Sequence, residues 1–163
     1  MDVRKVTHED AQSLLELFIQ LDEDTEFMLF EPGERATSLE EQHSIISMFQ
    51  NDDSKEMLVA ESSEICGFCV IVGGPQNRVA HVASLVIGVL KSKWGQGVGS
   101  KIMSNALSAA KTMGFSRIEL TVNINNSAAI NLYKKFGFTV EGERLSALQI
   151  NGSLVNEYYM AKV

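Results

Sequence analysis

Cysteine, proline and basic side chains are scarce in this chain of 163 residues. The only cysteines, Cys66 and Cys69, provide two of the four ligands of a structural zinc site, and no second pair supplies the others. Only two prolines and 45% hydrophobic residues indicate a folded rather than a disordered chain. Fourteen Lys and Arg against twenty-one Asp and Glu leave a net charge of −7, which disfavours nucleic acid and anionic membranes as partners.

Long apolar segments are also lacking. No run approaches the ~20 apolar residues that span a bilayer, and residues 1–5 do not resemble the start of a secretion signal. A chain of 163 residues buries roughly 70% of its unfolded surface, which is enough for one hydrophobic core. We therefore expect one cytoplasmic domain that spans residues 1–163.

The two cysteines lie within residues 65–72, which are predicted to form a strand. Side chains three positions apart in a strand point to opposite faces, and this separates the two thiols. We therefore expect two half-buried thiols, and neither a redox pair nor a metal site.

Apolar periodicity alternates along the chain between the spacing of strands and that of helices. Capping residues mark helix starts after Thr7, Ser38 and Asn126, and Gly114 and Gly137 mark helix ends. The predicted strands are residues 3–6, 57–60, 65–72, 79–90, 118–122, 138–150 and 154–163, and the predicted helices are 11–21, 39–49, 98–113 and 127–136. This order, β-α-α-β-β-β-α-β-α-β-β, is typical of a mixed α/β (α+β) fold with a mostly antiparallel sheet of six to seven strands and about four flanking helices.

Three glycines at alternate positions span the start of the helix at 98–113, in the segment Trp94-Gly95-Gln96-Gly97-Val98-Gly99-Ser100. Glycines let the backbone approach a ligand closely, and a helix start presents N–H groups that lack intrahelical partners. Because the helix dipole is positive at this end, the segment predicts a site for phosphate or diphosphate. The spacing of its glycines departs from that of a P-loop and from that of a dinucleotide-binding fingerprint.

A second motif follows the glycine-rich segment in register. Residues 126–138 are Asn-Ser-Ala-Ala-Ile-Asn-Leu-Tyr-Lys-Lys-Phe-Gly-Phe. This helix resembles the Asn-x-x-Ala-x-x-Leu-Tyr-x-Lys-x-Gly-Phe motif of the GNAT (Gcn5-related) N-acetyltransferases, and residues 94–99 resemble that family's Gln/Arg-x-x-Gly-x-Gly/Ala loop for acetyl-CoA. The predicted order of elements is also similar to the family's, so the resemblance covers essentially the whole chain.

The resemblance implies that acetyl-CoA is the acetyl donor and that Tyr133 is the general acid toward the departing thiolate, the alternative being a core tyrosine. Trp94 stands where many relatives carry Gln or Arg, so it either contacts the donor or packs beside the loop. Members of this family often form homodimers, so a homodimer is also implied. The implied acetyl-CoA contacts are Ile87, Gly88, Val89, Trp94, Gly95, Gln96, Gly97, Val98, Gly99, Ser100, Asn126, Ala129 and Tyr133.

Several relatives carry Glu or His as a general base where this chain has Ala83. His81 shares the strand parity of Ala83 and is either a base or a structural histidine, and Ser84 is a weaker candidate. Deprotonation at pH 7 costs about 4.6 kcal/mol for a lysine-like amine but only about 1.4 kcal/mol for an α-amino group. An α-amine acceptor can therefore lose its proton to water without a dedicated base.

Residues 23–35, between the first two helices, are acidic and partly apolar. Glu26, Phe27 and Glu31 are candidates for binding a cationic or amphipathic amine, although such a segment is more often a solvated surface. We predict an N-acetyltransferase that transfers an acetyl group from acetyl-CoA to a primary amine of a small molecule or amino acid, by direct attack in a ternary complex. The alternatives are a protein acetyltransferase for lysine or N-terminal amines, and an inert acyl-CoA-binding sensor on the same fold.

Overall fold

Seven strands form a single sheet in the computed structural model, which describes residues 1–163. The predicted order of strands and helices is confirmed. The elements are β1 (Asp2–Lys5), α1 (Ala11–Asp24), α2 (Leu39–Gln50), β2 (Lys55–Glu61), β3 (Ile65–Gly73), β4 (Val82–Val89), α3 (Val98–Thr112), β5 (Arg117–Asn123), α4 (Ser127–Lys135), β6 (Thr139–Ile150) and β7 (Ser153–Lys162). No helix combines the length and the apolar character needed to cross a bilayer.

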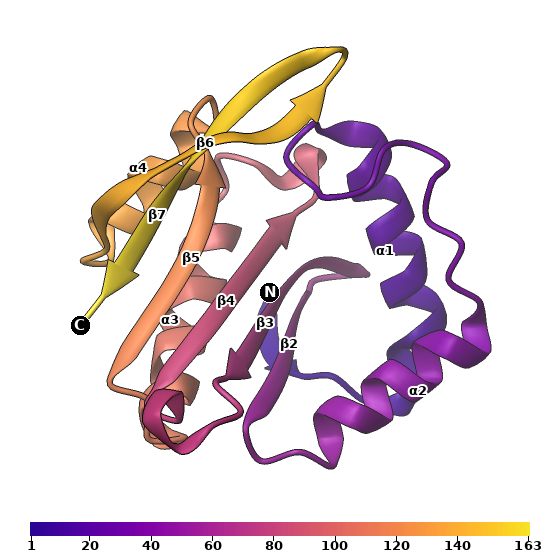
Figure 1. Ribbon diagram of the computed structural model, residues 1–163. Helices are drawn as coiled ribbons and strands as arrows, with labels where there is room; N and C mark the ends of the chain where they lie inside the picture. Colours follow the sequence, from indigo (N-terminus) through magenta and orange to yellow (C-terminus); the bar gives the residue numbers. More distant parts are fainter.

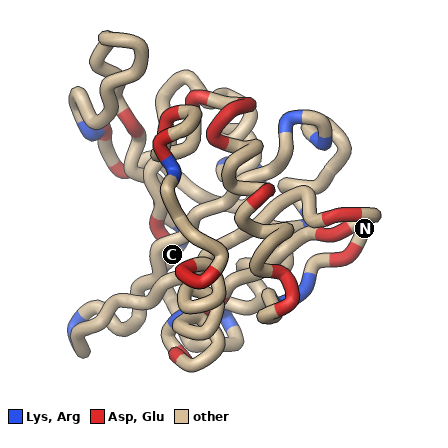
Figure 2. Tube along the Cα trace, turned by 90° about the vertical axis from the view of Figure 1, so that its right-hand side faces the viewer, with Lys and Arg blue, Asp and Glu red and all other residues tan.

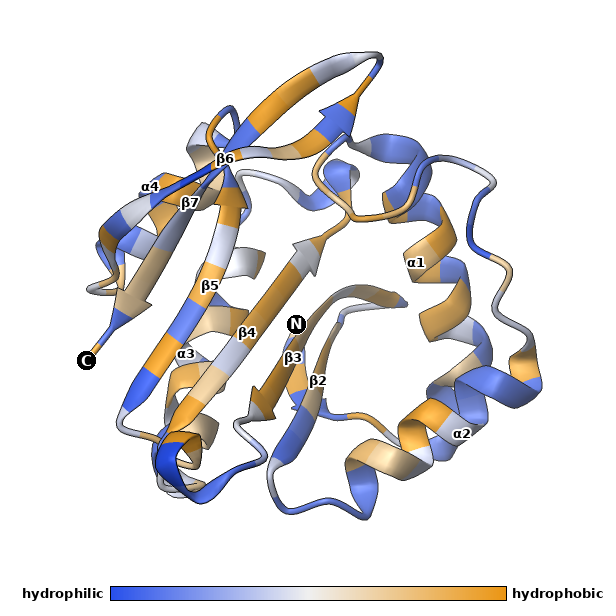
Figure 3. Cartoon of the chain, viewed as in Figure 1, coloured by the Kyte–Doolittle hydropathy of each residue, from blue (hydrophilic) through white to orange (hydrophobic).

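The strands follow the spatial order β1-β2-β3-β4-β5-β7-β6, and only the β4–β5 pair is parallel. Helices α3 and α4 lie behind the sheet in the view of Figure 1, and α1 and α2 lie on the other side, beside β2 and β3. Figure 3 shows the consequence for hydropathy, since apolar residues line β3, β4 and the sheet-facing side of α1. The sheet thus separates two hydrophobic cores.

One core, the α3 core, lies between the sheet and α3, and the other, the α1/α2 core, lies between the sheet and the first two helices. The α3 core includes Leu58, Cys66, Cys69, Ala83, Leu85, Ile102, Met103, Ala106, Leu120 and Tyr133. The α1/α2 core includes Leu14, Leu17, Leu21, Ile46, Phe49, Val59 and Phe68. Large apolar side chains on both sides of one sheet are what hold the layers together.

Part of the sheet has no helix over it on the side of α1 and α2. On β5, the side chains of Ile118, Leu120 and Val122 point into the α3 core. The residues between them therefore point to the opposite side of the sheet. On that side Val86, in a central strand, is 53% exposed. We call this surface the open face and define it by five residues, Ser84, Val86, Thr121, Glu157 and Tyr159.

Local signals in the sequence place the helix and hairpin ends correctly. Ser38 accepts a hydrogen bond from the N–H of Glu41 at the start of α2, as the capping pattern predicts. Gly114 ends α3 with a φ of +91°. The Asn151-Gly152 turn joins β6 to β7 with φ angles of 49° and 80°, as in a type I′ hairpin.

The strand predicted over residues 79–90 is too long, because β4 begins only at Val82 and ends at Val89. Val79 belongs instead to a short 3-10 helix, Asn77–Val79. The apolar run conceals this boundary, since an exposed valine in a turn and a buried valine in a strand look alike in the sequence.

The two cysteines lie on the same side of β3, which corrects the predicted separation. Gly67 and Ile65 face consecutive residues of β2, so Cys66 is an extra residue in a β-bulge. The extra residue shifts the alternation of side chains between the two faces of β3. Both thiols are therefore fully buried in the α3 core rather than half-buried. Burial raises the pKa of the Cys69 thiol to about 12, so that thiol is protonated at neutral pH.

Candidate active site

The loop before α3 presents a row of free backbone donors. The N–H groups of residues 95–100 have no acceptor within the protein, and the first bonded amide of the helix is Lys101, which donates to the Gly97 carbonyl at 3.0 Å. Gly95 and Gly97 have φ angles of 71° and 81°, which few residues other than glycine adopt. This geometry forms an anion site from main-chain atoms.

The side chains of this loop interact with the protein itself. Gln96 Nε2 donates to the Ser92 carbonyl at 3.0 Å, and Val98 is buried in the α3 core. The indole Nε1 of Trp94 donates to the Val89 carbonyl at 2.8 Å. This bond holds Trp94 beside the loop, and its contact with the donor stays a prediction.

Three lysines flank the loop without forming salt bridges. Acidic segments outnumber basic ones along the chain trace (Figure 2), yet Lys91, Lys93 and Lys101 have no carboxylate within salt-bridge distance. Lys101 donates to the Met1 carbonyl, and Lys91 and Lys93 have no partner. Ammonium groups without a carboxylate partner beside a helix N-terminus strengthen the attraction of the loop for an anion.

A gap opens between β4 and β5 next to this loop. The two strands pair only over Val82–Ser84 and Arg117–Glu119, although both continue beyond these residues. The N–H of Leu90 still donates to the Cys66 carbonyl of β3, so only the β5 edge of β4 is left free. An extended ligand chain can bind to such an edge as an additional strand would.

The backbone N–H and C=O groups of successive β4 residues point alternately toward β3 and toward β5, and this determines which residues face the gap. The His81 carbonyl accepts hydrogen bonds on the β5 side, and the Val82 carbonyl accepts one from β3. Continuing this alternation, the backbone groups of Leu85, Ile87 and Val89 point into the gap, and the Val89 carbonyl already accepts the bond from Trp94. Leu85 is missed by sequence reasoning, because only the strand register identifies it.

Two glycines have structural roles that their sequence context does not reveal. Gly88 pairs with Phe68 of β3, and a Cβ at Gly88 would lie 2.5 Å from Cε1 of that ring. Its backbone faces away from the gap, so the predicted contact between Gly88 and acetyl-CoA lacks a geometric basis. At Gly99, a Cβ would lie 3.2 Å from Cδ2 of Leu132, so glycine here lets α4 pack closely against α3.

Tyr133 projects from α4 into the α3 core and is only 6% exposed. Burial raises the pKa of its phenol above the ordinary value, and the neighbouring Cys69 adds to the rise. Cys69 pairs with Ile87 of β4, so Tyr133 lies near the level of the gap-facing groups. No hydrogen bond within the protein involves its hydroxyl, and the oxygen is not enclosed. The phenol is therefore protonated and free to donate a hydrogen bond to a ligand that reaches it.

Asn126 caps the helix that carries Tyr133. Its Oδ1 accepts a hydrogen bond from the Ala129 N–H at 3.2 Å, which confirms the predicted capping role. The same bond occupies the Ala129 N–H, which leaves that amide no free proton for acetyl-CoA.

His81 does not lie on the strand as predicted. It is an exposed residue in the turn before β4, at the end where β4 and β5 are still paired. Ile87 is six residues further along, a span of about 20 Å in a strand. This distance excludes direct proton transfer between His81 and a group in the gap.

The segment between α1 and α2 approaches the tip of the β6–β7 hairpin. Glu26 Oε1 accepts a hydrogen bond from Asn151 Nδ2 at 3.0 Å, and Phe27, the next residue in the chain, is 40% exposed. Glu31 is exposed, and its N–H donates to the Glu34 carboxylate. The structure thus brings Glu26 to the hairpin, and no hydrogen bond joins Phe27 or Glu31 to it.

A buried ion pair holds this segment against α1. Arg35 Nε lies 2.7 Å from Oδ2 of Asp22, a carboxylate that is 2% exposed. The guanidinium also lies over the rings of Phe18 and Phe30, at 4.9 and 4.6 Å from their centroids. These contacts fix the segment between α1 and α2 against α1.

Replacing Arg35 with Ala is expected to destabilise the protein by about 3 to 5 kcal/mol, because Asp22 is left buried without a counter-ion. Urea denaturation monitored by circular dichroism measures the loss. Adding Asp22→Asn to this variant removes the unpaired charge and is expected to recover part of the stability. Equal stability of the single and double variants would contradict this account.

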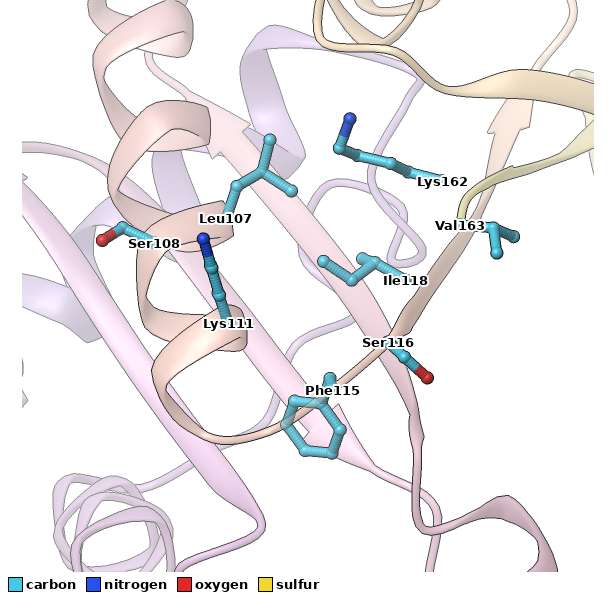
Figure 4. Close-up of a pocket in the computed structure, with 8 residues that line it drawn as sticks. All are labelled: Leu107, Ser108, Lys111, Phe115, Ser116, Ile118, Lys162 and Val163. Carbon is cyan, nitrogen blue, oxygen red and sulfur yellow. The ribbon is translucent and has the colours of Figure 1, made fainter.

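Two pockets lie away from the loop that precedes α3. One of about 410 Å³ is located between the C-terminal half of α3, β5 and the end of β7, where Lys111 and Lys162 point toward it (Figure 4). The other, of about 400 Å³, lies near Gly74 and Ser84. The gap lies between two central strands of the sheet, and the pattern of backbone pairing reveals it.

Comparison with known proteins identifies the family. The model of the acetyltransferase (GNAT) family matches residues 15–138, which include the loop, the gap and Tyr133. The chain belongs to the GNAT family. Its fold, a seven-stranded and mostly antiparallel sheet with four helices, is that of GNAT acetyltransferases of known structure.

Individual relatives agree with this assignment of the GNAT chain. An L-amino acid N-acetyltransferase of Escherichia coli is 35% identical over 111 residues, which are 67% of this chain and 68% of that protein. A GNAT acetyltransferase of Streptococcus pneumoniae superposes with a TM-score of 0.94 and 27% identity, covering 99% of this chain and 97% of that one. A putative acetyltransferase of Salmonella typhimurium, solved with acetyl-CoA, has a TM-score of 0.87 and 17% identity over 99% and 92% of the two chains.

GNAT enzymes use acetyl-CoA as the acetyl donor, and this GNAT chain offers groups that suit that molecule. Amides without acceptors at residues 95–100 match a diphosphate, and the free β4 edge matches an extended arm that carries amide groups. The two features are adjacent, since the loop follows β4 directly in the chain.

Proposed function

We propose that this protein transfers the acetyl group of acetyl-CoA to the primary amine of a small molecule, with L-amino acids as the main acceptor class. The observation that carries the proposal is the adjacency of free loop amides and an unpaired strand edge. Each alone is common, but together they suit a donor with a diphosphate at one end and a thioester at the other.

In this mechanism the amides of residues 95–100 bind the diphosphate, and Lys91 and Lys93 add long-range attraction. The gap-facing groups of Leu85 and Ile87 bind the arm of the donor in an extended conformation. A backbone N–H on this edge also stabilises the negative charge that develops on the reacting carbonyl oxygen. The bound donor supplies an activated acetyl thioester.

Tyr133 holds a proton at its hydroxyl oxygen, beside the position of the departing sulfur. The raised pKa of its phenol keeps that proton in place at physiological pH. Asn126 fixes the first turn of α4 and thereby the orientation of the ring. The acceptor amine attacks the thioester carbon directly, so both substrates are bound together.

An α-amino acceptor suits a site that lacks a dedicated base. Ala83 occupies the position of the usual base, and His81 is too far from the gap. Water can remove the proton of an α-ammonium group, because its deprotonation at pH 7 costs only about 1.4 kcal/mol. A lysine side chain would require about 4.6 kcal/mol, so the site favours amino acids over protein lysines.

The test is calorimetry with acetyl-CoA followed by measurement of free CoA released with a panel of amines. The panel contains L-amino acids, spermidine, a lysine-containing peptide and a peptide with a free N-terminus. We expect acetyl-CoA to bind and L-amino acids to give the highest kcat/KM. Faster turnover of either peptide would make this a protein acetyltransferase, and binding without any turnover would indicate an acyl-CoA sensor.

A further inference from the structure

An ion pair on the open face lies at the level of the gap. Continuing the parallel register of β4 and β5 beyond Ser84 and Glu119 brings Asn123 level with Gly88. Asn123 pairs with Glu157 of β7, so Glu157 lies one strand beyond β5, about 4.8 Å further across the sheet. The side chain of Glu157 points to the open face, where an acceptor can approach the gap.

Glu157 has a single ionic partner, Arg144 of β6. Arg144 Nη1 lies 3.2 Å from Glu157 Oε1, and the two side chains are 51% and 12% exposed. No other hydrogen bond involves this guanidinium, and Oε2 of Glu157 accepts none. The pair therefore offers free donors on one side and a free acceptor on the other, beside the place where the amine must sit.

A β-bulge fixes the position of Arg144. Between the pairs Arg144–Glu157 and Leu148–Val155, the three residues 145–147 of β6 face Asn156 alone. Oδ1 of Asn156 accepts a hydrogen bond from the Ser146 N–H at 2.8 Å, and its Nδ2 donates to Glu143 at 3.3 Å. Bulges commonly re-aim a side chain next to a functional site.

We propose that Arg144 and Glu157 form the subsite for the head group of an α-amino acid. Arg144 binds the α-carboxylate, and Glu157 binds the α-ammonium group before it loses its proton. The inference rests on the proposed function and adds how the acceptor is recognised. The head group of an α-amino acid carries a negative carboxylate and a positive ammonium group close together. The Arg144–Glu157 pair presents one positive and one negative group that complement them.

The same geometry discriminates against other amines. A polyamine brings only positive charges to the subsite, and Arg144 repels them. A lysine side chain in a protein has no carboxylate close to its amine, so it leaves the guanidinium without a partner. Specificity therefore comes from Arg144, whereas Glu157 favours any cationic amine.

The experiment compares L-methionine and L-phenylalanine with their amides, which keep the α-ammonium group but lack the carboxylate. Calorimetry in the presence of coenzyme A gives Kd, and CoA release gives KM. We expect the native protein to prefer each acid over its amide by about tenfold. Arg144→Gln is expected to remove this preference. Glu157→Gln is expected to weaken the binding of acids and amides alike by about tenfold.

Arg117→Gln is the matched control. Arg117 is also an arginine on this sheet with carboxylate partners, Glu119 and Glu141, but it lies at the end where β4 and β5 are paired. Its replacement should leave the preference for acids unchanged.

Equal binding of acid and amide by the native protein, or equal weakening of both in Arg144→Gln, overturns the subsite. So does the absence of amino-acid binding. Failure of the proposed function is separate, because it appears as a loss of acetyl-CoA binding or as no turnover of any amine. A protein that binds acetyl-CoA and acetylates only amines other than amino acids remains an acetyltransferase but lacks this subsite.

Discussion

Replacing Tyr133 with Phe is expected to lower kcat by roughly 100-fold, the smaller end of the effect of a general acid. The Kd for acetyl-CoA should stay within about twofold, because backbone groups bind the donor. The fold should also be unaffected, since no hydrogen bond within the protein involves the Tyr133 hydroxyl. Initial-rate kinetics with the best acceptor of the panel, calorimetry and thermal unfolding measure the three quantities.

Tyr158→Phe provides the control, because Tyr158 is partly buried against the same α3 core and has no place in the mechanism. Its kcat should match that of the native protein. A native kcat in Tyr133→Phe would rule out the role of its hydroxyl as an acid and leave Tyr133 as a core residue.

The raised pKa of Tyr133 also predicts the pH dependence. The phenol stays protonated below about pH 10, its ordinary pKa, and burial extends this range upward. The value of kcat/KM should therefore rise with pH as the acceptor amine loses its proton, and show no decline between about pH 6 and pH 9.5. A decline within this range that disappears in Tyr133→Phe would mean that the phenol ionises far more readily than its burial allows.

Local features of the sequence predict most of the architecture. Three boundaries are set by atoms only a few residues apart, so their geometry follows from sequence spacing. They are the start of α2 at Ser38 and Glu41, the start of α4 at Asn126, and the Asn151-Gly152 hairpin turn. The loop at 94–100 is also determined by residues that are close together in the sequence. Its alternate glycines and the helix that follows suffice to predict free amides, whatever the rest of the fold does.

Features that depend on strand register are not predictable in this way. The bulge at Cys66 depends on how β3 pairs with β2, and it places both thiols in one core. Gly88 is required by the ring of Phe68, which lies on the neighbouring strand. His81 lies in a turn rather than in β4, because an apolar run does not show where a strand begins. Such contacts join residues far apart in the chain, and no local pattern encodes them.

Replacing Gly97 with Val is expected to weaken acetyl-CoA binding by at least tenfold, because the free amides of residues 95–100 depend on the left-handed conformation of Gly97. A β-branched residue at a φ of +81° is strained, by about 1 to 2 kcal/mol or more. A Cβ at this position meets no protein atom within 4 Å, so the core is not disturbed. Calorimetry with acetyl-CoA measures the loss of affinity.

Gly114→Val separates ligand binding from backbone strain. Gly114 lies just beyond the other end of α3, with a φ of +91° and open space where a Cβ would be. Both variants should therefore lose similar stability in urea denaturation, because both place a β-branched residue in the left-handed region. Only Gly97→Val should also lose acetyl-CoA affinity, since the amides beside Gly97 bind the diphosphate and those beside Gly114 do not. Equal affinity of the two variants for acetyl-CoA would place the diphosphate elsewhere, and the gap between β4 and β5 would then lose its role as the path of the donor.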